Sequence, residues 1–210
     1  MADAARLRIL LVGAGGTIGR AVAAELGARH DVVAAGRKSG TVQIDIDDPA
    51  SVVAAIRKVG PIDAVACASG ATEFRPLGMI EVASVTQSVY ALGLASKLMG
   101  QVNLALAARE TLRDGGSITL VSGVLSDTPI VAGSSASMVN GALEAFVRAA
   151  AIELPRGLRI NVISPTVLTE SMPAFGPFFR GFEPVPASRV ALAYSRSIEG
   201  AQTGQVYRVP

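Results

Sequence analysis

Residues 7–20 read LRILLVGAGGTIGR, an apolar run followed by a turn that holds four glycines and then by the start of an alanine-rich segment. Such a turn between a strand and a helix lets backbone N–H groups approach a pyrophosphate closely, at a helix N-terminus that favours negative charge. Glycines also serve tight turns for steric reasons alone, but this position favours a binding role. We predict that the turn binds a dinucleotide through Gly13, Gly15, Gly16, Thr17, Ile18 and Gly19.

The rest of the chain alternates short β-branched runs with longer alanine-rich segments. We expect strands at residues 7–13, 31–37, 41–46, 63–69, 116–123, 158–165 and 204–209. We expect helices at residues 17–30, 49–60, 84–112, 135–154 and 186–198. Strands that are apolar on both faces and are separated by helices indicate a parallel sheet covered on both sides, which is a doubly wound α/β fold.

The composition limits the classes of protein to consider. Of the 210 residues, half are apolar and 17% are charged, which is typical of one globular domain, here residues 1–210. The formal net charge of +2 is spread along the chain, so we expect no nucleic-acid partner. The single cysteine, Cys67, excludes a disulfide framework and a cysteine metal site, and no other pattern of metal ligands is present.

No apolar run reaches the length of a transmembrane helix, and the one at the N-terminus is too short for a signal peptide. We therefore expect a cytoplasmic protein without membrane contact.

The second expected strand ends in AAGRKSG, residues 34–40. In dinucleotide-binding folds a carboxylate at this place holds the ribose 2′-hydroxyl of NAD, whereas cations suit the 2′-phosphate of NADP. Arg37, Lys38 and Ser39 offer two cations and a hydroxyl, so we predict NADP(H) rather than NAD(H). The alternative is a solvated turn that is rich in charge.

Several motifs, taken in order, resemble the short-chain dehydrogenase/reductase family over essentially the whole chain. TVQIDI resembles the family's third strand, DAVACASG the strand that usually ends in Asn-Asn-Ala-Gly, and RINVISPTV the strand that ends in Pro-Gly beside the nicotinamide. PASRVALAYSRSI and AQTGQVYRV resemble the last helix and strand. The resemblance implies one Rossmann domain with seven parallel strands in the order 3-2-1-4-5-6-7. It also implies cofactor contacts from Asp45, Ile46, Ala68, Ser69, Gly70, Pro165, Thr166, Val167 and Leu168.

The sequence departs from the family's pattern within these motifs. Thr17 replaces the middle glycine of the glycine turn, although Gly16 beside it can take over the close approach. Asn-Asn-Ala-Gly becomes Cys-Ala-Ser-Gly at residues 67–70, and Pro-Gly becomes Pro-Thr at residues 165–166. These changes alter the detail of the expected pocket without removing it.

The catalytic motif departs further. The family uses a serine after the fifth strand to polarise a carbonyl, a tyrosine to move the proton, and a lysine four residues later to lower the pKa of the tyrosine. Residues 133–138, GSSASM, place Ser134 at the tyrosine position and Met138 at the lysine position. A serine cannot act as an acid near neutral pH without an activating base, and methionine supplies none. Ser122 or Gly123 takes the place of the family's serine.

A lysine stands where the family usually has an asparagine, because SKLMGQV places Lys97 there. We expect it at the edge of an apolar stripe that faces the sheet, formed by Leu94, Leu98 and Val102. A partly buried ammonium has a lowered pKa and can donate a proton. We predict that Lys97 and Ser122 handle the proton and that Ser134 hydrogen-bonds the substrate. The alternative for Lys97 is an ordinary surface lysine.

An aromatic segment follows the sixth expected strand. SMPAFGPFFRGFEPVPAS contains four of the six phenylalanines of the chain. The family builds a substrate lid here, and clustered aromatic side chains suit an apolar pocket wall. A loop packed on the core or a subunit contact is the alternative.

These features imply an oxidoreductase that transfers a hydride between NADP(H) and a small carbonyl, alcohol or imine. Two other classes stay open. One is a pseudo-enzyme that binds NADP(H) and acts as an interaction protein, because the usual tyrosine and lysine are missing. The other is a non-redox isomerase or lyase on the same fold. The resemblance also implies a small-molecule substrate and a homodimer or homotetramer built on the two long helices.

Overall fold

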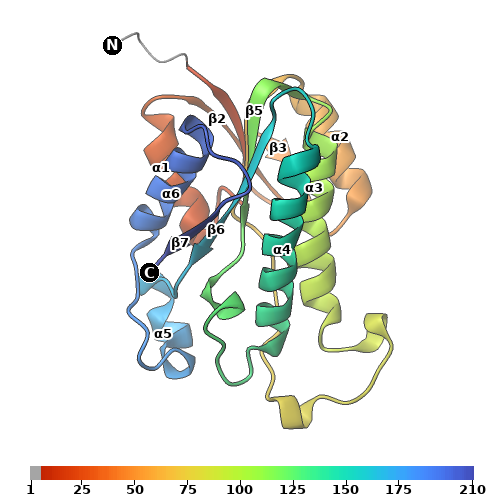
Figure 1. Cartoon of the computed structure of the whole chain (residues 1–210), viewed down its shortest axis with the longest axis vertical. Helices are drawn as coiled ribbons and strands as arrows, with labels where there is room; N and C mark the ends of the chain where they lie inside the picture. The colour runs from red at the N-terminus through yellow and green to blue at the C-terminus, as the bar shows by residue number, and fades with distance from the viewer. Residues whose placement is uncertain (1–5) are drawn as a thin grey trace.

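Seven parallel strands form a single sheet in the order β3-β2-β1-β4-β5-β6-β7, which confirms the predicted topology. A computed structural model of the chain describes residues 6–210, so the first five residues of the expected 1–210 domain lie outside the described part. The strands are β1 (Arg8–Val12), β2 (Asp31–Gly36), β3 (Val42–Gln43), β4 (Ile62–Cys67), β5 (Leu112–Val121), β6 (Arg159–Pro165) and β7 (Val206–Val209). Their carboxyl ends lie along one edge of the sheet, toward the bottom of Figure 1.

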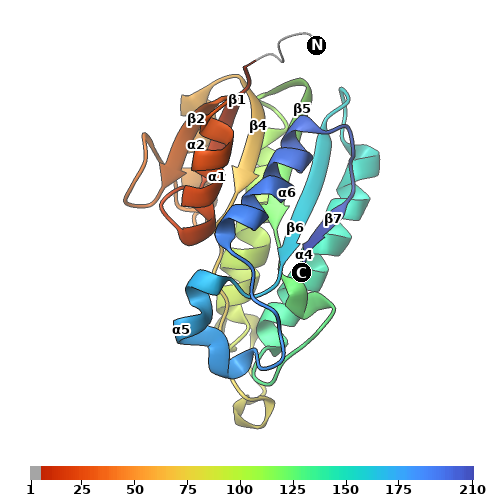
Figure 2. The same cartoon turned by 90° about the vertical axis from the view of Figure 1, so that its left-hand side faces the viewer.

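Helices cover both faces of the sheet (Figures 1 and 2). One face carries α1 (Thr17–Gly27) and α6 (Ala187–Glu199), and the other carries α2 (Pro49–Val59), α3 (Gln101–Ala108) and α4 (Ser134–Glu153). Successive residues of β1 point to opposite faces, so Ile9 and Leu11 join the core under α1 and α6, while Leu10 and Val12 join the core under the other three helices. Because both faces are buried, β1 from Ile9 to Val12 and β4 from Ala64 to Cys67 are apolar without alternation.

The glycine turn brings α1 against the end of β1. A Cβ added to Gly19 would lie 2.0 Å from the carbonyl oxygen of Gly13, so only glycine fits at this position of α1. Gly13 itself has a φ of +83°, and a Cβ there would lie 2.6 Å from the carbonyl oxygen of Ala68, just after β4. The two glycines therefore allow β1, β4 and α1 to meet closely at the carboxyl edge.

The region between β4 and β5 differs most from the expectation, which was one helix over residues 84–112. It contains a 3-10 turn at Val85–Gln87, a π-helical segment at Gly93–Gly100 (η3) and α3, which ends at Ala108. The hydroxyls of Ser84 and Ser88 bond locally, to the Gln87 side chain and the Val85 carbonyl, and such local bonds compete with helix formation. The helix therefore starts later than the alanine-rich composition suggests.

The segment η3 turns a different face to the protein than an α-helix would. Its buried residues are Gly93, Ser96 and Gly100, whereas the expected stripe at residues 94, 98 and 102 is only half-buried. Hydrogen bonds of a π-helix run from i to i+5, so the side chains are displaced around the axis relative to an α-helix. Added Cβ atoms would lie 2.8 Å from the Ser135 hydroxyl at Gly93 and 2.8 Å from the Ile46 carbonyl oxygen at Gly100. These small residues let η3 lie close against its neighbours.

Gln101, at the junction of η3 and α3, ties this segment to the end of β5. Its Nε2 donates to the carbonyl oxygens of Lys97 at 2.8 Å and Val121 at 2.9 Å, and its Oε1 accepts from the Val121 N–H at 2.9 Å. Pairing of β4 with β5 ends at Thr119, so Val121 has no strand partner on that side. One fully buried amide thus satisfies backbone groups that would otherwise lack partners.

Replacement of Gln101 by leucine should lower the free energy of unfolding by on the order of 3 kcal/mol, because each buried backbone group left without a partner costs about 1–3 kcal/mol. Urea denaturation followed by circular dichroism measures the change. Gln87→Ala is the control, because Gln87 is exposed, and it should change the stability by less than about 0.5 kcal/mol. A Gln101→Leu variant as stable as the wild type would contradict the role given to this side chain.

Candidate active site

Two adjoining cavities open at the carboxyl edge of the sheet. The first, of about 420 Å³, lies between the glycine turn and the segments that follow β2, β3 and β4. The second, of about 350 Å³, lies between η3, α4 and the segments that follow β4, β5 and β6. Gly70 lines both cavities, so one extended ligand can pass from the first into the second. Open α/β sheets bind their ligands at this edge.

The first cavity collects most residues predicted to hold the adenosine and pyrophosphate. Its lining includes Gly13, Gly15, Gly16, Arg37, Ser39, Asp45, Ile46, Ser69 and Gly70. Five other predicted residues lie outside it, namely Thr17, Ile18, Gly19, Lys38 and Ala68. Gly19 and Ala68 instead make the close contacts with Gly13 and so shape the turn. Asp47, Leu92 and Ser96 line the cavity without having been predicted, because only the fold brings them there.

The glycine turn has the geometry that a pyrophosphate needs. Helix α1 begins at Thr17 with no side-chain cap and no acidic residue in its first turn. Its first backbone N–H groups are therefore available to an anion. A Cβ on Gly15 would lie 2.8 Å from the Ser39 hydroxyl, so the glycine turn and the segment after β2 close toward each other around the cavity.

The charges of the first cavity come from two segments. β2 ends in Gly36, with no carboxylate at the place where one would hold a ribose hydroxyl, and Arg37 follows directly in the lining. Asp45 and Asp47 contribute carboxylates from the segment after β3, and Oδ1 of Asp45 accepts a hydrogen bond from the Asp47 N–H at 3.1 Å. A cation and a hydroxyl thus come from the β2 side.

The second cavity combines apolar walls with a few polar groups. Its apolar side chains include Phe74, Leu125, Val167, Phe175 and Phe179. The residues predicted beside the nicotinamide also line it, namely Pro165, Thr166, Val167 and Leu168. Of the three predicted catalytic residues, Lys97 and Ser122 line this cavity and Ser134 does not.

Lys97 reaches the second cavity from η3. Its side chain contacts Gly70 so closely that a Cβ there would lie 2.8 Å from Lys97 Cδ. Burial lowers the pKa of the Lys97 ammonium from its ordinary 10.5 to about 8, with a smaller opposing effect from Cys67. A lysine with a pKa near 8 can give up and recover a proton close to neutral pH. The π-helical segment therefore carries a titratable group into the cavity, as such segments often do at functional sites.

Ser122 lies directly after β5 and is almost fully buried. Its hydroxyl donates to Oε1 of Glu144 at 2.9 Å, and Glu144 is a buried residue of α4 that the sequence analysis did not select. The available signal was a carboxylate on an alanine-rich helix with few charged residues. It could not be read from sequence as a partner of Ser122, because 22 residues separate the two along the chain.

The face of α4 that meets the cavity differs from the expected one. Ser134 contacts the Tyr90 hydroxyl at 3.2 Å, and Met138 is exposed. The α4 residues that line the second cavity are Ala136 and Asn140, which have the same four-residue spacing. A shift of two residues turns a side chain by about 200° around an α-helix, so the expected pair and the observed pair lie on different faces. The cavity thus meets neither a tyrosine nor a lysine from α4.

The aromatic segment after β6 closes one side of the second cavity. Phe175 and Phe179 line it, and the Phe74 ring packs against Phe175 with ring centroids 5.9 Å apart. Oε1 of Glu170 accepts a hydrogen bond at 3.0 Å from the N–H of Ala187, where α6 begins. The segment therefore bridges the loop after β4 and the start of α6.

Cys67, the last residue of β4, is fully buried, and burial raises the pKa of its thiol to about 11. Its carbonyl oxygen accepts a hydrogen bond at 2.6 Å from the hydroxyl of Tyr194, whose pKa burial raises well above the usual value. Both groups stay protonated near neutral pH and serve the structure.

Within residues 6–210, no group of three or more His, Cys, Asp or Glu side chains could hold a metal ion. No helix in the same part of the chain is both long enough and apolar enough to cross a membrane.

The fold and the two cavities define a doubly wound α/β protein whose parallel sheet carries two adjoining cavities along its carboxyl edge. A family model described as enoyl-(acyl carrier protein) reductase matches residues 13–206. The chain therefore belongs to the short-chain dehydrogenase/reductase family of oxidoreductases.

Solved structures and a curated protein share this similarity. The protein lin1944 of Listeria innocua is 46% identical, with a TM-score of 0.92 and coverage of 97% of this chain and 100% of that chain. A small-chain dehydrogenase in complex with NADPH is 26% identical, with a TM-score of 0.83 and coverage of 98% and 97%. An uncharacterized oxidoreductase of Methylorubrum extorquens is 33% identical over 145 residues, which are 66% of this chain and 56% of that protein. The chain thus spans about half the length of this curated relative.

Lys97→Met should raise the free energy of unfolding near pH 7 by about 1–2 kcal/mol, because it removes a buried ammonium and keeps an apolar chain of similar length. The folded pKa lies below the unfolded one, so between about pH 8 and 10.5 the unfolded chain binds a proton that the folded protein has released. The free energy of unfolding of the wild type therefore increases with pH in this range. The difference in stability between Lys97→Met and the wild type should shrink as the pH rises.

Urea denaturation at about pH 7 and about pH 10 measures this difference. The control is Lys58→Met on α2, where the lysine is exposed and the variant should show no such trend. A Lys97→Met advantage that does not change with pH would show that Lys97 keeps its ordinary pKa.

Proposed function

We propose that the protein is an NADP(H)-dependent oxidoreductase that transfers a hydride between the nicotinamide and a small carbonyl or imine, with Lys97 as the proton donor. The observation that carries this proposal is the position of Lys97. Its pKa is lowered to about 8, and it lines the same cavity as residues 165–168, the segment expected beside the nicotinamide. No other lysine lines that cavity among the described residues.

The first cavity supports NADP(H) as the cofactor. Arg37 and Ser39 can bind a 2′-phosphate, while the glycine turn and the uncapped start of α1 can bind the pyrophosphate. A small-chain dehydrogenase of the same fold was solved with NADPH, which agrees with this choice. The bound cofactor supplies the hydride, and the chain must orient the substrate and handle one proton.

Lys97 handles that proton in the proposed reaction. Its ammonium donates a proton to the substrate oxygen or nitrogen as the hydride arrives at the neighbouring carbon, and the resulting amine recovers a proton from solvent. Ser122 hydrogen-bonds the substrate from the β5 side. Ser134 is left out of this reaction, because its hydroxyl contacts Tyr90 outside the cavity lining.

Arg37→Ala should weaken NADPH binding by about 10- to 100-fold and leave NADH binding nearly unchanged, because a hydrogen bond to a charged group is worth about 1.5–3 kcal/mol. Titration of the protein with each reduced nucleotide, followed by nucleotide fluorescence, measures the affinities. Lys38→Ala removes the neighbouring cation that lies outside the cavity, so it should weaken NADPH binding by less than about threefold. Failure of the wild type to bind either nucleotide would contradict the proposal and favour a non-redox isomerase or lyase.

Lys97→Ala should lower the turnover number for carbonyl reduction by about 10²- to 10⁴-fold, because it removes the proton donor. In the wild type, reduction should slow as the pH rises through about 8, and this dependence should disappear in the variant. Steady-state oxidation of NADPH over a pH series, together with NADPH affinity, separates loss of the donor from loss of cofactor binding.

Met138→Ala is the matched control for this experiment. Met138 occupies the position at which alignment places the family's lysine, yet it is exposed outside the cavity, so its variant should keep normal turnover. Full turnover of Lys97→Ala would end the proposed role of Lys97. Tight NADPH binding by a wild type that reduces no carbonyl would favour the cofactor-binding pseudo-enzyme.

A further inference from the structure

A buried carboxylate lies behind the second cavity and has no part in the reaction proposed above. Only 4% of the Glu144 side chain is exposed, and its Oε1 accepts from the hydroxyls of Ser122 at 2.9 Å and Ser126 at 2.7 Å. Its Oε2 lies 3.8 Å from guanidinium nitrogens of Arg148 and Arg208. The carboxylate is thus balanced by two cations and bonded to two hydroxyls.

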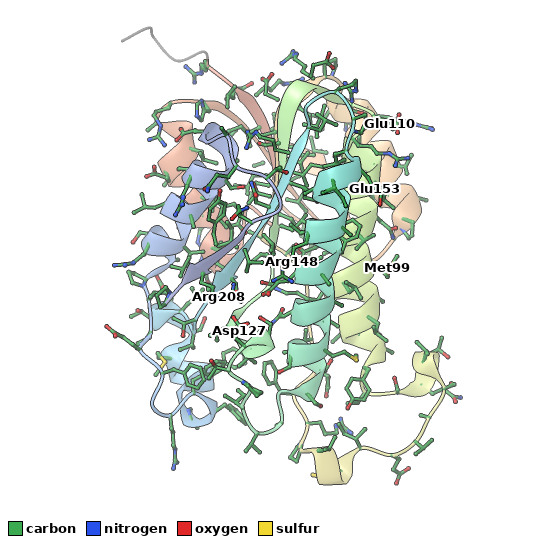
Figure 3. The ribbon with its side chains drawn as sticks, viewed as in Figure 1. Met99, Glu110, Asp127, Arg148, Glu153 and Arg208 are labelled. Atoms are coloured by element: carbon green, nitrogen blue, oxygen red, sulfur yellow. The ribbon has the colours of Figure 1, made fainter. Side chains whose placement is uncertain are left out.

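The cations around Glu144 come from separate elements. Figure 3 shows Arg148 on α4, and beside it Arg208 of β7 and Asp127 of the segment that follows β5. Arg208 also pairs with Asp127, with Nε and Oδ2 2.6 Å apart. Arg148 and Arg208 are about half exposed, so the carboxylate is charge-paired toward solvent and hydrogen-bonded toward the cavity. The bonds from Ser122 and Ser126 fix which way Glu144 Oε1 points, while both arginines lie on the side of Oε2.

The contact with Glu144 decides how the Ser122 hydroxyl can be used. A serine hydroxyl carries one proton, and a bond to a carboxylate is stronger than one to a neutral carbonyl. The other acceptor near this hydroxyl, the Ile163 carbonyl oxygen, is farther away at 3.4 Å. The proton of Ser122 therefore goes to Glu144, and toward a ligand Ser122 can only accept. A family serine that polarises a carbonyl must donate instead.

Asn140 adds a second acceptor to the same wall. It lies one turn before Glu144 on α4, is 5% exposed, and its Nδ2 donates to the Gly123 carbonyl oxygen at 3.2 Å. This contact fixes the orientation of the amide, and Oδ1 is buried without a hydrogen-bond partner in the described part of the chain. Ser122 and Asn140 both line the second cavity. A ligand with a suitable donor would remove the cost of an unsatisfied buried acceptor.

We propose that Glu144 is a positioning residue that makes Ser122 a hydrogen-bond acceptor, so that the site selects carbonyl compounds with a hydroxyl or amine N–H beside the carbonyl. This inference rests on the proposed function. Lys97 donates to the carbonyl oxygen, while the substrate's own donor meets the acceptors on the β5 and α4 wall. The hydroxyls of Thr72, Thr166 and Ser171 also line the cavity, but each can donate or accept and does not discriminate.

Two ketones of equal size test the selection. Phenacyl alcohol and propiophenone differ by a hydroxyl in place of a methyl group, and their phenyl ring suits the aromatic wall. Isothermal titration calorimetry of each ketone into the protein with bound NADP⁺ gives the dissociation constants without turnover. The kcat/KM for each ketone with NADPH is measured in parallel. The wild type should prefer phenacyl alcohol by about 5- to 10-fold, the value of one hydrogen bond.

Glu144→Ala and Ser122→Ala should each reduce this preference by about 5-fold or more, and the double variant should lose no more than either single variant. That coupling is expected only if Glu144 acts through Ser122. A purely structural Glu144 would change the binding of both ketones alike and leave their ratio unaltered. Arg148→Ala is the control, because it removes an exposed partner of Oε2 and leaves the Ser122 contact with Oε1 in place, so the ratio should not change.

Ser122→Ala also tests the acceptor role while it keeps the carboxylate and its bond from Ser126, so a misfolded Glu144→Ala variant would not prevent the test. A Ser122→Ala variant that keeps the preference would overturn the inference, as would a wild type without preference or without binding of phenacyl alcohol. Reduction of both ketones without preference would overturn the inference and leave the proposed function in place. A preference in binding without reduction of either ketone would contradict the proposed function and leave the selection by Ser122 in place.

Discussion

Hydrogen bonding at the carboxyl ends of the central strands is the constraint on which the site depends. All seven strands are parallel, so their ends meet at one edge, and there β4 and β5 separate and leave backbone groups without strand partners. Gln101 satisfies Val121 from the α3 face, and Tyr194 satisfies the Cys67 carbonyl from the α6 face. Side chains from both helical layers thus satisfy the backbone groups at the ends of β4 and β5, and the two cavities open beyond these strand ends.

Helix α4 corresponds to the helix that carries the family's tyrosine and lysine, but in this chain its side chains hold the segment after β5. Ala136, Asn140 and Glu144 follow one another at four-residue spacing, and the last two hold the segment after β5 through Gly123 and Ser122. A lysine instead reaches the second cavity from η3, where close contact with Gly70 holds Lys97 in a partly buried position. Burying an ammonium lowers stability, and such local costs are typical of functional sites.

The sequence predicts features that depend on local pattern and on chain order. Apolar strands separated by helices were enough to predict a parallel sheet covered on both sides, and the resemblance to the family supplied the strand order. The glycine turn was enough to locate one end of the first cavity. Features that depend on the rotation of a helix were not predictable in this way. The face of α4 differed by two residues from the aligned one, and the π-helical geometry of η3 exposed part of a stripe that an α-helix would bury. Glu144 was missed because its role exists only through contacts with Ser122, Ser126 and Arg208, which come from other elements.

The pairing of α1 with α6 links the first helix of the chain to the last one. Contacts along this pair include Arg29 and His30 with Glu199, about 170 residues away, and Tyr194 reaches Cys67 across 127 residues. During synthesis, the apolar face of β5 and β6 that α6 covers therefore stays open until residues 187–199 have been made. Long-range contacts of this kind form late and slow the folding of a domain. The core that contains Val22, Leu26 and Tyr194 can then be complete only after α6 has docked, so the sheet should reach its full stability at that step and not before.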